Sequence, residues 1–420
     1  MLLLSAAAAL PARELPLSLE REVPPAWELK EWVDRFCRED MGGRRGVSPG
    51  AALAAKTVAR MFCLAGLRPG GPGGSYYQPF PVALPGDRGR CRNVLGLLPG
   101  RRPGAVILCA HYDHIGRGGG QSRRPGDGRI HPGANDNASG LAVLLGLARA
   151  FGRRPDRLGR TLLFAAWGAE ELGALGSRWW VDHPTLPLEQ VTFLVNLDMV
   201  GRCRGRLLAA GAASARGLER ELAGLAGGLE VVPIALSFGG SDHQVFLDRG
   251  IPALHLFTGA DTTYHTPADR PDRILPAGLR RVALFTGRLA LHLARRPLPY
   301  AFDPAGRGGM AGVKPPAGPR PAFGSIPDFS QTRGGYRLAG VKPGSPAARA
   351  GLRRGDLMIA FGGRPLDTFR DYVAALFAHK PGQVVAVEVV REGRRMEVEV
   401  ELGTAPPRGA GGKVHPGRRK

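Results

Sequence analysis

The chain has 420 residues, which at roughly 150 residues per domain allows two to three domains. Hydrophobic residues make up 43% and charged residues 22%, a globular composition that excludes a fully disordered chain. The 62 Gly and 37 Pro residues follow no period, which excludes a collagen-like chain. The formal net charge is +22, but Arg is spread along the chain and is not interleaved with aromatic residues. We therefore expect no specific nucleic-acid partner.

The cysteines and the N-terminus bear on where the protein resides. The sequence has no CxxC and an odd number of cysteines, so we expect no disulfide framework, although one bridge stays open. No apolar run reaches the roughly 18 residues of a membrane-spanning helix. Residues 1–20 begin with MLLLSAAAALPA, which predicts an export signal or a disordered leader. A signal implies a secreted or periplasmic protein, and a leader leaves a cytoplasmic one possible.

The first predicted elements are two helices, at 27–39 and 51–65, separated by a turn-rich segment. Apolar runs and helical patterns then alternate. Strands are predicted at 94–98, 105–110, 161–166, 191–197 and 251–257, and helices at 139–151, 214–225 and 276–295. Runs such as AVILCA and TFLVNL suit strands that are buried on both faces. The alternation predicts a layered α/β domain over residues 21–300.

A second, smaller domain is predicted at 322–404. The Gly/Pro-rich residues 301–321 have no periodicity and are expected to be a linker. Beyond them, strands are predicted at 336–341, 357–361, 384–391 and 396–402, with one helix at 368–378. Residues 405–420 form a basic tail that we expect to be disordered.

Polar side chains follow the predicted strands of the first domain, where ligands bind in open α/β sheets. Taken one by one, these polar residues have ordinary explanations: a surface turn, a helix N-cap or a solvated face. Their repeated placement instead predicts a metal centre. The candidate residues are His111, Asp113, Asp136, Glu170, Glu171, Asp198, Tyr264 and His265.

The charges of these residues favour two divalent cations. Three carboxylates (Asp136, Glu171, Asp198) and one bridging hydroxide would cancel four positive charges. Each ion would then have one imidazole, one carboxylate of its own, and a share of Asp136 and of the hydroxide, which is the four-coordination that zinc prefers. Ligand sets of N and O without thiolate also suit Co²⁺ or Mn²⁺. Two ions about 3.5 to 4 Å apart polarise a carbonyl and generate hydroxide near neutral pH.

Three candidates stay outside this ligand set. Glu170 is placed to take a proton from the bridging water and pass it to a leaving amine. Asp113 is suited to hold the second ring nitrogen of His111. Tyr264 could donate a hydrogen bond to a developing oxyanion, or it is a half-buried aromatic residue on a loop.

Six segments of residues 25–300 together resemble the co-catalytic zinc aminopeptidase family, which includes secreted bacterial aminopeptidases. In chain order they are AHYDHIG, GANDNASG, WGAEELGALGS, NLDMVG, GSDHQVF and TTYHTPAD. The resemblance implies a three-layer mixed-sheet zinc exopeptidase fold. The Gly-rich loop RGGGQSRRPGDGR between the first two segments is expected to rim the site and to affect which substrates enter.

The same resemblance implies a role for each matching residue. His111 and Asp198 would bind one zinc, Glu171 and His265 the other, with Asp136 bridging and Glu170 as the general base. Some family members carry Asp where Asn135 stands, a change beside the bridging residue. Asp242 and His243 match a family segment near the active site, without an assigned role; a structural turn explains them equally well.

Residues 322–403 resemble a PDZ domain of the type found with bacterial proteases. The segments that carry the resemblance are VKPGSPAARAGLRRGDLMIAFGG, FRDYVAALFAHKPG and VVAVEVVREGRRMEVEVEL. Such domains bind an extended peptide beside an edge strand. By position, residues 323–326 would receive a terminal carboxylate, although they depart from the usual loop sequence. A PDZ domain that only packs on the catalytic domain is the alternative.

The sequence thus predicts a zinc metallopeptidase that removes N-terminal residues from peptide substrates, with the PDZ domain available for a peptide or protein ligand. Three alternatives stay open: a carboxypeptidase with the same metal core, a glutaminyl cyclase with a single zinc, and an inactive scaffold that binds partners through its PDZ domain.

Overall fold

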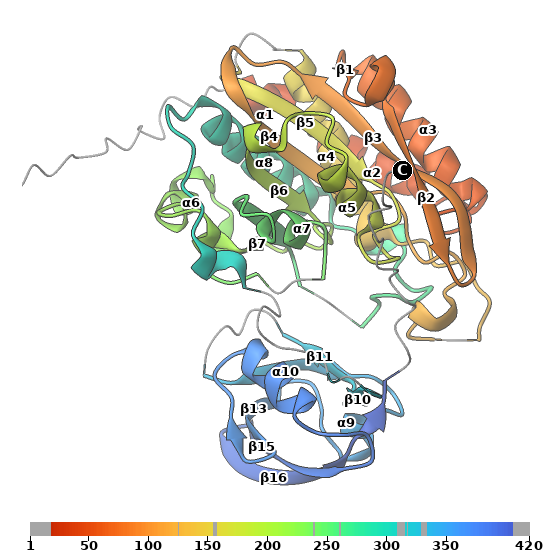
Figure 1. The fold of residues 1–420 in the computed structure, drawn as a ribbon, viewed down its shortest axis with the longest axis vertical. Helices are drawn as coiled ribbons and strands as arrows, with labels where there is room; N and C mark the ends of the chain where they lie inside the picture. The colour runs from red at the N-terminus through yellow and green to blue at the C-terminus, as the bar shows by residue number, and fades with distance from the viewer. Residues whose placement is uncertain are drawn as a thin grey trace, which may run out of the picture.

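The computed structural model of the chain describes residues 18–124, 126–153, 158–237, 240–259, 262–308, 316, 318–328 and 334–405. They form two domains, and Figure 1 shows the smaller C-terminal domain below the N-terminal one. Residues 1–17, with most of the predicted leader, and residues 406–420 of the predicted tail lie outside the described residues. Secretion therefore stays a prediction.

A nine-stranded mixed sheet forms the centre of the N-terminal domain. Its order is β1-β3-β5-β4-β6-β9-β7-β8, and β2 pairs with β3. The strands are β1 (Arg68–Pro69), β2 (Tyr77–Leu84), β3 (Asp87–Leu98), β4 (Arg102–His111), β5 (Arg160–Trp167), β6 (Val191–Leu197), β7 (Arg206–Ala210), β8 (Glu230–Ile234) and β9 (Ala253–Phe257).

The four adjacent strands β5, β4, β6 and β9 run parallel to one another. They are the continuous apolar runs of the sequence, and β4 is buried from Ala105 to its end. Parallel strands with buried side chains on both faces need a covering layer on each side. Because their carboxyl ends meet at one edge of the sheet, the residues that follow these strands are brought together there.

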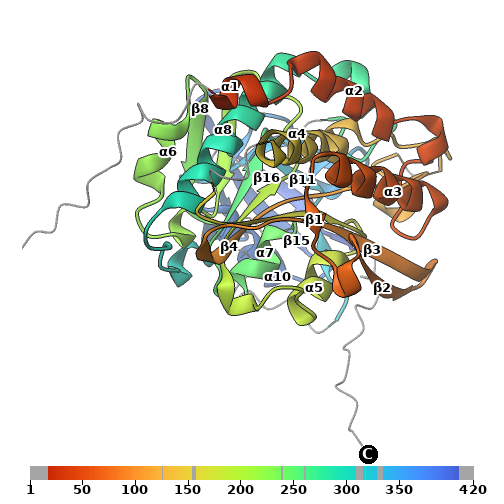
Figure 2. The same cartoon turned by 90° about the horizontal axis from the view of Figure 1, so that it is seen from above.

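Helices cover both faces of the sheet, which confirms the expected three-layer α/β fold (Figure 2). Val106 and Leu108 of β4 pack in one apolar cluster, whereas Ile107 and Cys109 pack in another on the opposite face. The first layer contains α1 (Ser18–Glu22), α2 (Ala26–Phe36), α3 (Pro49–Leu64), α4 (Gly140–Gly152), α6 (Glu219–Leu225) and α8 (Pro276–Arg295), and the second contains α5 (Leu175–Asp182) and α7 (His243–Leu247).

Several elements differ from the sequence prediction. Helix 276–295 has the predicted bounds, but the helix predicted from 214 begins at Glu219, because residues 212–214 form a separate 3-10 turn. Strands β2, β7 and β8 and helices α5 and α7 were not predicted. Residues 302–308, expected to be part of the linker, lie against the N-terminal domain: Phe302 bridges Ala215, and the Asp303 amide donates to the Ser214 carbonyl.

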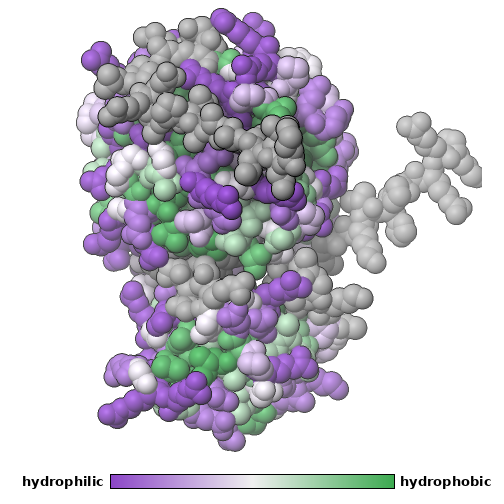
Figure 3. Space-filling view, turned by 90° about the vertical axis from the view of Figure 1, so that its left-hand side faces the viewer, coloured by the Kyte–Doolittle hydropathy of each residue, from purple (hydrophilic) through white to green (hydrophobic). Residues whose placement is uncertain are grey.

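The C-terminal domain has its own apolar core and an antiparallel sheet. Its strands are β11 (Ser325–Pro327), β12 (Tyr336–Val341), β13 (Leu357–Phe361), β14 (Arg364–Pro365), β15 (Val384–Arg391) and β16 (Arg394–Glu401), with a separate pair β10 (Pro321–Ala322) and β17 (Gly403–Thr404). Its helices are α9 (Pro346–Arg349) and α10 (Phe369–Phe377), the second starting in a capping box of Thr368 and Asp371. Figure 3 shows polar side chains spread over both domains, with smaller apolar patches between them.

Two sequence predictions concern disulfide bonds and membrane-spanning helices. All five cysteines are free, so the single disulfide that was left open is not formed. Within the described part of the chain, no helix has both the length and the apolar character to cross a bilayer.

The buried side chain of Arg44 ties the segment after β4 to the segment before α4. Its guanidinium is fully buried and donates to the carbonyls of Tyr112 (2.9 Å), Pro132 (2.7 Å) and Gly133 (2.9 Å), and also to that of Phe36. A buried carbonyl that loses its donor costs free energy because water does not replace the partner.

We therefore expect Arg44→Met to lower the free energy of unfolding by about 3 kcal/mol. All five Trp residues lie in the N-terminal domain, so urea unfolding followed by Trp fluorescence reports on this domain. Arg38→Met is the matched control, because exposed Arg38 pairs with exposed Asp40, and its effect should stay below about 0.5 kcal/mol. Equal losses in both variants would show that Arg44 does not hold these segments.

Candidate metal centre

The carboxyl ends of the four parallel strands bring the predicted residues together. His111 is the last residue of β4, Glu170 and Glu171 follow β5, and Asp198 follows β6 directly. His265 lies in the segment after β9. Asp136 comes from the segment 134–139 that leads into α4, where the Asp136–Asn137 peptide bond is cis.

The first cluster of ligand atoms consists of His111, Asp136 and Asp198. His111 Nε2 lies 3.4 Å from Asp136 Oδ1 and 3.5 Å from Asp198 Oδ1. The His111 side chain is 1% exposed and that of Asp198 is 12% exposed, so the cluster is buried on the β4 side and reached by solvent on the β6 side.

The second cluster consists of His265, Glu171, Asp136 and His114. His265 Nε2 lies 3.1 Å from both Asp136 Oδ2 and Glu171 Oε2. His114 Nδ1 lies 2.8 Å from Glu171 Oε1 and 3.7 Å from Asp136 Oδ2.

The Asp136 carboxylate belongs to both clusters. Its Oδ1 faces His111, and its Oδ2 faces His265 and His114. A carboxylate with one oxygen toward each of two ligand groups has the geometry needed to bridge two cations.

The donor set fits divalent cations. His114 Nε2 and Asp198 Oδ1 are buried atoms without a hydrogen-bond partner among the described residues. Burial disfavours the charged form of His111, but Glu170, Asp136 and Asp198 hold its pKa well above the usual range. Burial likewise opposes ionisation of Asp136, yet the three histidines hold its pKa well below the usual range. This concentration of negative charge is what bound divalent cations neutralise.

Glu170 lies beside the clusters without belonging to either of them. Its Oε2 is 3.9 Å from His111 Nε2, and its side chain is 11% exposed. Burial raises the pKa of Glu170 well above its usual range; His111 opposes this shift, and the carboxylate of Asp242 adds to it. A carboxyl group that is ready to hold a proton beside the ligands suits a general base and acid.

The Asp113 carboxylate does not make the hydrogen bond to His111 that the sequence predicts. Its carboxylate Oδ1 is 3.9 Å from His111 Nδ1, too far for a hydrogen bond, and the backbone carbonyl of Asp113 faces that nitrogen at 3.2 Å instead. The carboxylate accepts the backbone N–H groups of Glu170 (3.0 Å) and Glu171 (3.3 Å). Asp113 therefore fixes the turn that presents both glutamates.

Tyr264 and the Gly-rich loop lie at the His265 side of the site. The Tyr264 ring stacks on that of His265, with the centroids 3.9 Å apart, and the Arg123 guanidinium lies over the Tyr264 ring, 4.6 Å from its centroid. The Arg123 amide donates to the His265 carbonyl (3.0 Å), and the Gln121 carbonyl faces His265 Nδ1 (3.1 Å). The loop thus contacts the predicted site and orients one of its histidines.

Two residues that shape the site were not assigned from the sequence. His114 stands in the quoted segment AHYDHIG, three positions after His111, and this spacing was the available signal. Asp269 ends the segment TTYHTPAD, and its carboxylate accepts the amides of Asn135 and Asp136, each at 3.0 Å. It is a buried positioning residue, and its place in this quoted segment was the available signal.

Asp242 and His243 lie behind the site rather than in it. Both are fully buried; Asp242 accepts a hydrogen bond from Ser177 Oγ at 2.5 Å, and His243 stacks on His255. The neighbouring Ser241 donates to Asp198 Oδ2 at 2.8 Å. Through this hydrogen bond, the segment positions the Asp198 carboxylate.

Comparison with known proteins now identifies the N-terminal domain. Residues 93–290 match peptidase family M28. This part of the chain is an M28 domain. Residues 327–402 match the PDZ domain family, so the chain joins an M28 domain to a C-terminal PDZ domain.

The M28 domain is similar in sequence to aminopeptidase YwaD of Bacillus subtilis, with 32% identity over 200 residues. This alignment covers 44% of the present chain and 40% of YwaD. The chain therefore spans less than half the length of this curated relative.

Two solved structures show the same fold. A Zn-dependent exopeptidase from Parabacteroides distasonis has a TM-score of 0.54 at 19% identity, covering 65% of this chain and all of that one (100%). Glutaminyl cyclase from Porphyromonas gingivalis has a TM-score of 0.54 at 21% identity, covering 64% of this chain and 98% of that one. The fold is thus shared by two different activities.

Proposed function

We propose that the protein is a zinc aminopeptidase with two metal ions per chain and Glu170 as the general base. The observation that supports this proposal most is the position of Asp136, with one oxygen toward His111 and Asp198 and the other toward His265 and Glu171. Cobalt or manganese would suit the same ligands.

When bound, the two ions would polarise the scissile carbonyl and make water acidic near neutral pH. His111 and Asp198 would hold one ion, His265 and Glu171 the other, and Asp136 both. Glu170 would accept a proton from the attacking water at its carboxylate and deliver it to the amine that leaves. The Asp113 carboxylate accepts a hydrogen bond from the backbone amide of Glu170 and so keeps Glu170 in place.

Tyr264 is proposed to donate a hydrogen bond to the developing oxyanion, since its ring stacks against His265 at the edge of the site. The PDZ domain is proposed to bind a peptide by strand addition at β11, which lies at the edge of its sheet. In the loop 323–326, Phe323 is buried against Phe361 and Tyr372, which anchors the start of β11.

Hydrolysis of matched peptides tests the function. We expect peptides with a free N-terminal amine to be cleaved one residue at a time, N-acetylated counterparts to resist cleavage, and a zinc chelator to abolish the activity until zinc is returned. Mass spectrometry of the products identifies the cleaved end. Equal cleavage of free and acetylated peptides, or release from the C-terminus, would contradict the proposal.

Glutaminyl cyclase is the second candidate, because a cyclase of that class shares the fold. The second cluster of His265 and Glu171 around Asp136 favours two ions over one. Conversion of N-terminal glutamine to a cyclic product without peptide cleavage, by protein with one zinc per chain, would favour the cyclase.

A further inference from the structure

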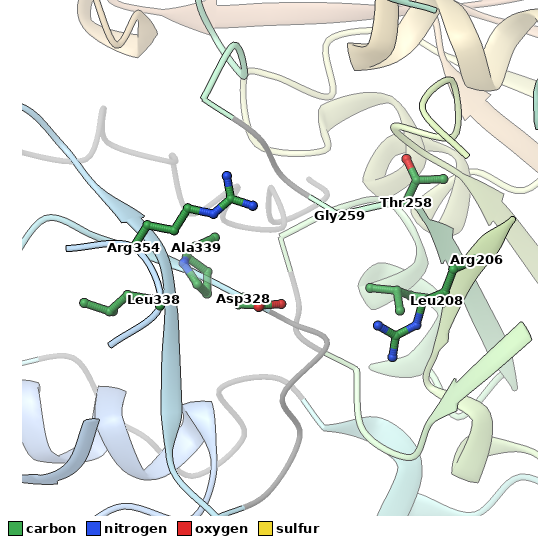
Figure 4. Close-up of a pocket in the computed structure, with 10 residues that line it drawn as sticks. Arg206, Leu208, Thr258, Gly259, Asp328, Leu338, Ala339 and Arg354 are labelled. Atoms are coloured by element: carbon green, nitrogen blue, oxygen red, sulfur yellow. The ribbon is translucent and has the colours of Figure 1, made fainter. Parts of the chain in front are cut away.

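A cavity of about 270 Å³ lies between the M28 and PDZ domains (Figure 4). Its M28 wall includes Arg206 and Leu208 of β7 and Thr258 after β9. Its PDZ wall includes Leu338 of β12 and Arg354 before β13. Both domains are therefore needed to form it.

The cavity wall contacts residues that lie next to the predicted ligands, in the segments that follow β6 and β9. Thr258 Oγ1 donates to the carbonyl of Met199 at 2.6 Å, and Met199 follows the predicted ligand Asp198. Leu208 and Met199 belong to one apolar cluster, against which Tyr264 packs. Since Tyr264 also stacks on His265, this cluster connects the cavity wall with the predicted site.

The PDZ domain also approaches the rim of the metal site. Burial, with the Arg123 guanidinium as the second cause, lowers the pKa of the Lys342 ammonium. Lys342 follows β12 of the PDZ domain, whereas Arg123 belongs to the loop that contacts His265. Lys342 therefore lies near the loop that contacts His265.

Two guanidinium groups point into the cavity from opposite walls (Figure 4). Arg354 makes no hydrogen bond or ion pair with another residue in the described parts of the chain. Arg206 pairs with Glu230 at 3.3 Å, but both side chains are about half exposed or more, and such pairs are weak. Asp328 also points inward and has a partner of its own. Buried Leu208 and Leu338 also line the cavity.

We propose that this cavity is a substrate subsite that binds a carboxylate of a peptide whose N-terminus lies at the metal centre. Arg354 of the PDZ domain and Arg206 of the M28 domain receive the carboxylate, because guanidinium groups form strong charge-assisted hydrogen bonds with it. The apolar walls contact the peptide between its two ends. This assignment rests on the proposed aminopeptidase function, and it makes the PDZ domain part of the substrate cleft.

The carboxylate could be the C-terminus of a short peptide or an acidic side chain, and three peptides separate these sources. They are Leu-Gly-Gly as the free acid, Leu-Gly-Gly amide, and Leu-Gly-Glu amide. We expect both peptides with a carboxylate to bind more tightly than Leu-Gly-Gly amide. Preference for the free acid alone assigns the site to the C-terminus, and preference for the glutamate peptide alone assigns it to a side chain.

The decisive variant is Arg354→Glu in the full chain, with zinc bound and Glu170→Gln as the background, so that binding is measured by calorimetry without turnover. We expect the preferred carboxylate peptide to bind about tenfold more weakly and Leu-Gly-Gly amide to bind unchanged. Arg353→Glu is the matched control: Arg353 is the adjacent residue, it pairs with Glu392 at 2.8 Å, and it does not line the cavity.

Two results would overturn the subsite. The first is equal affinity of all three peptides for the protein with Arg354 intact. The second is equal weakening of peptide binding by Arg354→Glu and Arg353→Glu, which would indicate only a general charge effect. These results are distinguishable from failure of the proposed function. Peptide cleavage without carboxylate preference rejects the subsite alone. An Arg354-dependent preference in a protein that cleaves no peptide rejects the aminopeptidase and keeps the carboxylate site.

Discussion

Glu170→Gln is expected to retain both metal ions and to lower turnover by about a hundred- to ten-thousandfold. Glu170 lies 3.9 Å from His111 Nε2 but outside both ligand clusters, so loss of its charge should leave metal binding intact. The amide keeps the size of the side chain and removes the proton acceptor. Metal content by elemental analysis and kcat on a leucyl peptide check the two parts of the prediction.

The neighbouring Glu171 provides the control for this prediction. Its carboxylate lies in the second cluster, 3.1 Å from His265 Nε2, so Glu171→Gln is expected to lose zinc as well as activity. Retained turnover in Glu170→Gln would remove Glu170 from the general-base role. Loss of metal from Glu170→Gln but not from Glu171→Gln would mean that the two roles are exchanged.

Asp136→Ala is expected to lose both ions together, with no measurable peptidase activity. The Asp136 carboxylate lies within reach of both His111 and His265, at 3.4 Å and 3.1 Å from their Nε2 atoms. His111→Ala is the comparison, because His111 belongs to the first cluster only and its loss should affect one ion more than the other. Zinc-to-protein ratios after dialysis check both variants. Loss of a single ion from Asp136→Ala would contradict a shared carboxylate.

The fold could be predicted from the sequence where apolar runs were continuous. The four parallel strands have such runs because both of their faces are buried, and their carboxyl ends then place the polar residues that follow them. Two of the missed strands, β2 and β8, lack this signal. β2 (YQPFPVAL) contains two prolines, which an edge strand tolerates because its outer N–H groups need no partner. β8 (EVVPI) also contains a proline and is an edge strand.

The residue types of the candidate site could be predicted from the sequence, but their contacts required the structure. Asp113 was expected to contact His111 with its carboxylate; the chain turns so that its backbone carbonyl does so, and the carboxylate holds the amides of Glu170 and Glu171. Asp269 is separated from Asp136 by 133 positions, so its contact depends on the packing of distant loops. The cavity between the domains depends on how they dock, for which the sequence has no local pattern.

The proposal that the Asp136 carboxylate lies between two zinc ions is tested most directly by X-ray diffraction at the zinc absorption edge, from crystals of the full chain grown with zinc. Two anomalous peaks about 3.5 to 4 Å apart, one on each side of the Asp136 carboxylate, are the expected result. A single peak bound by His111 or by His265 alone, or peaks away from Asp136, would contradict a two-metal centre.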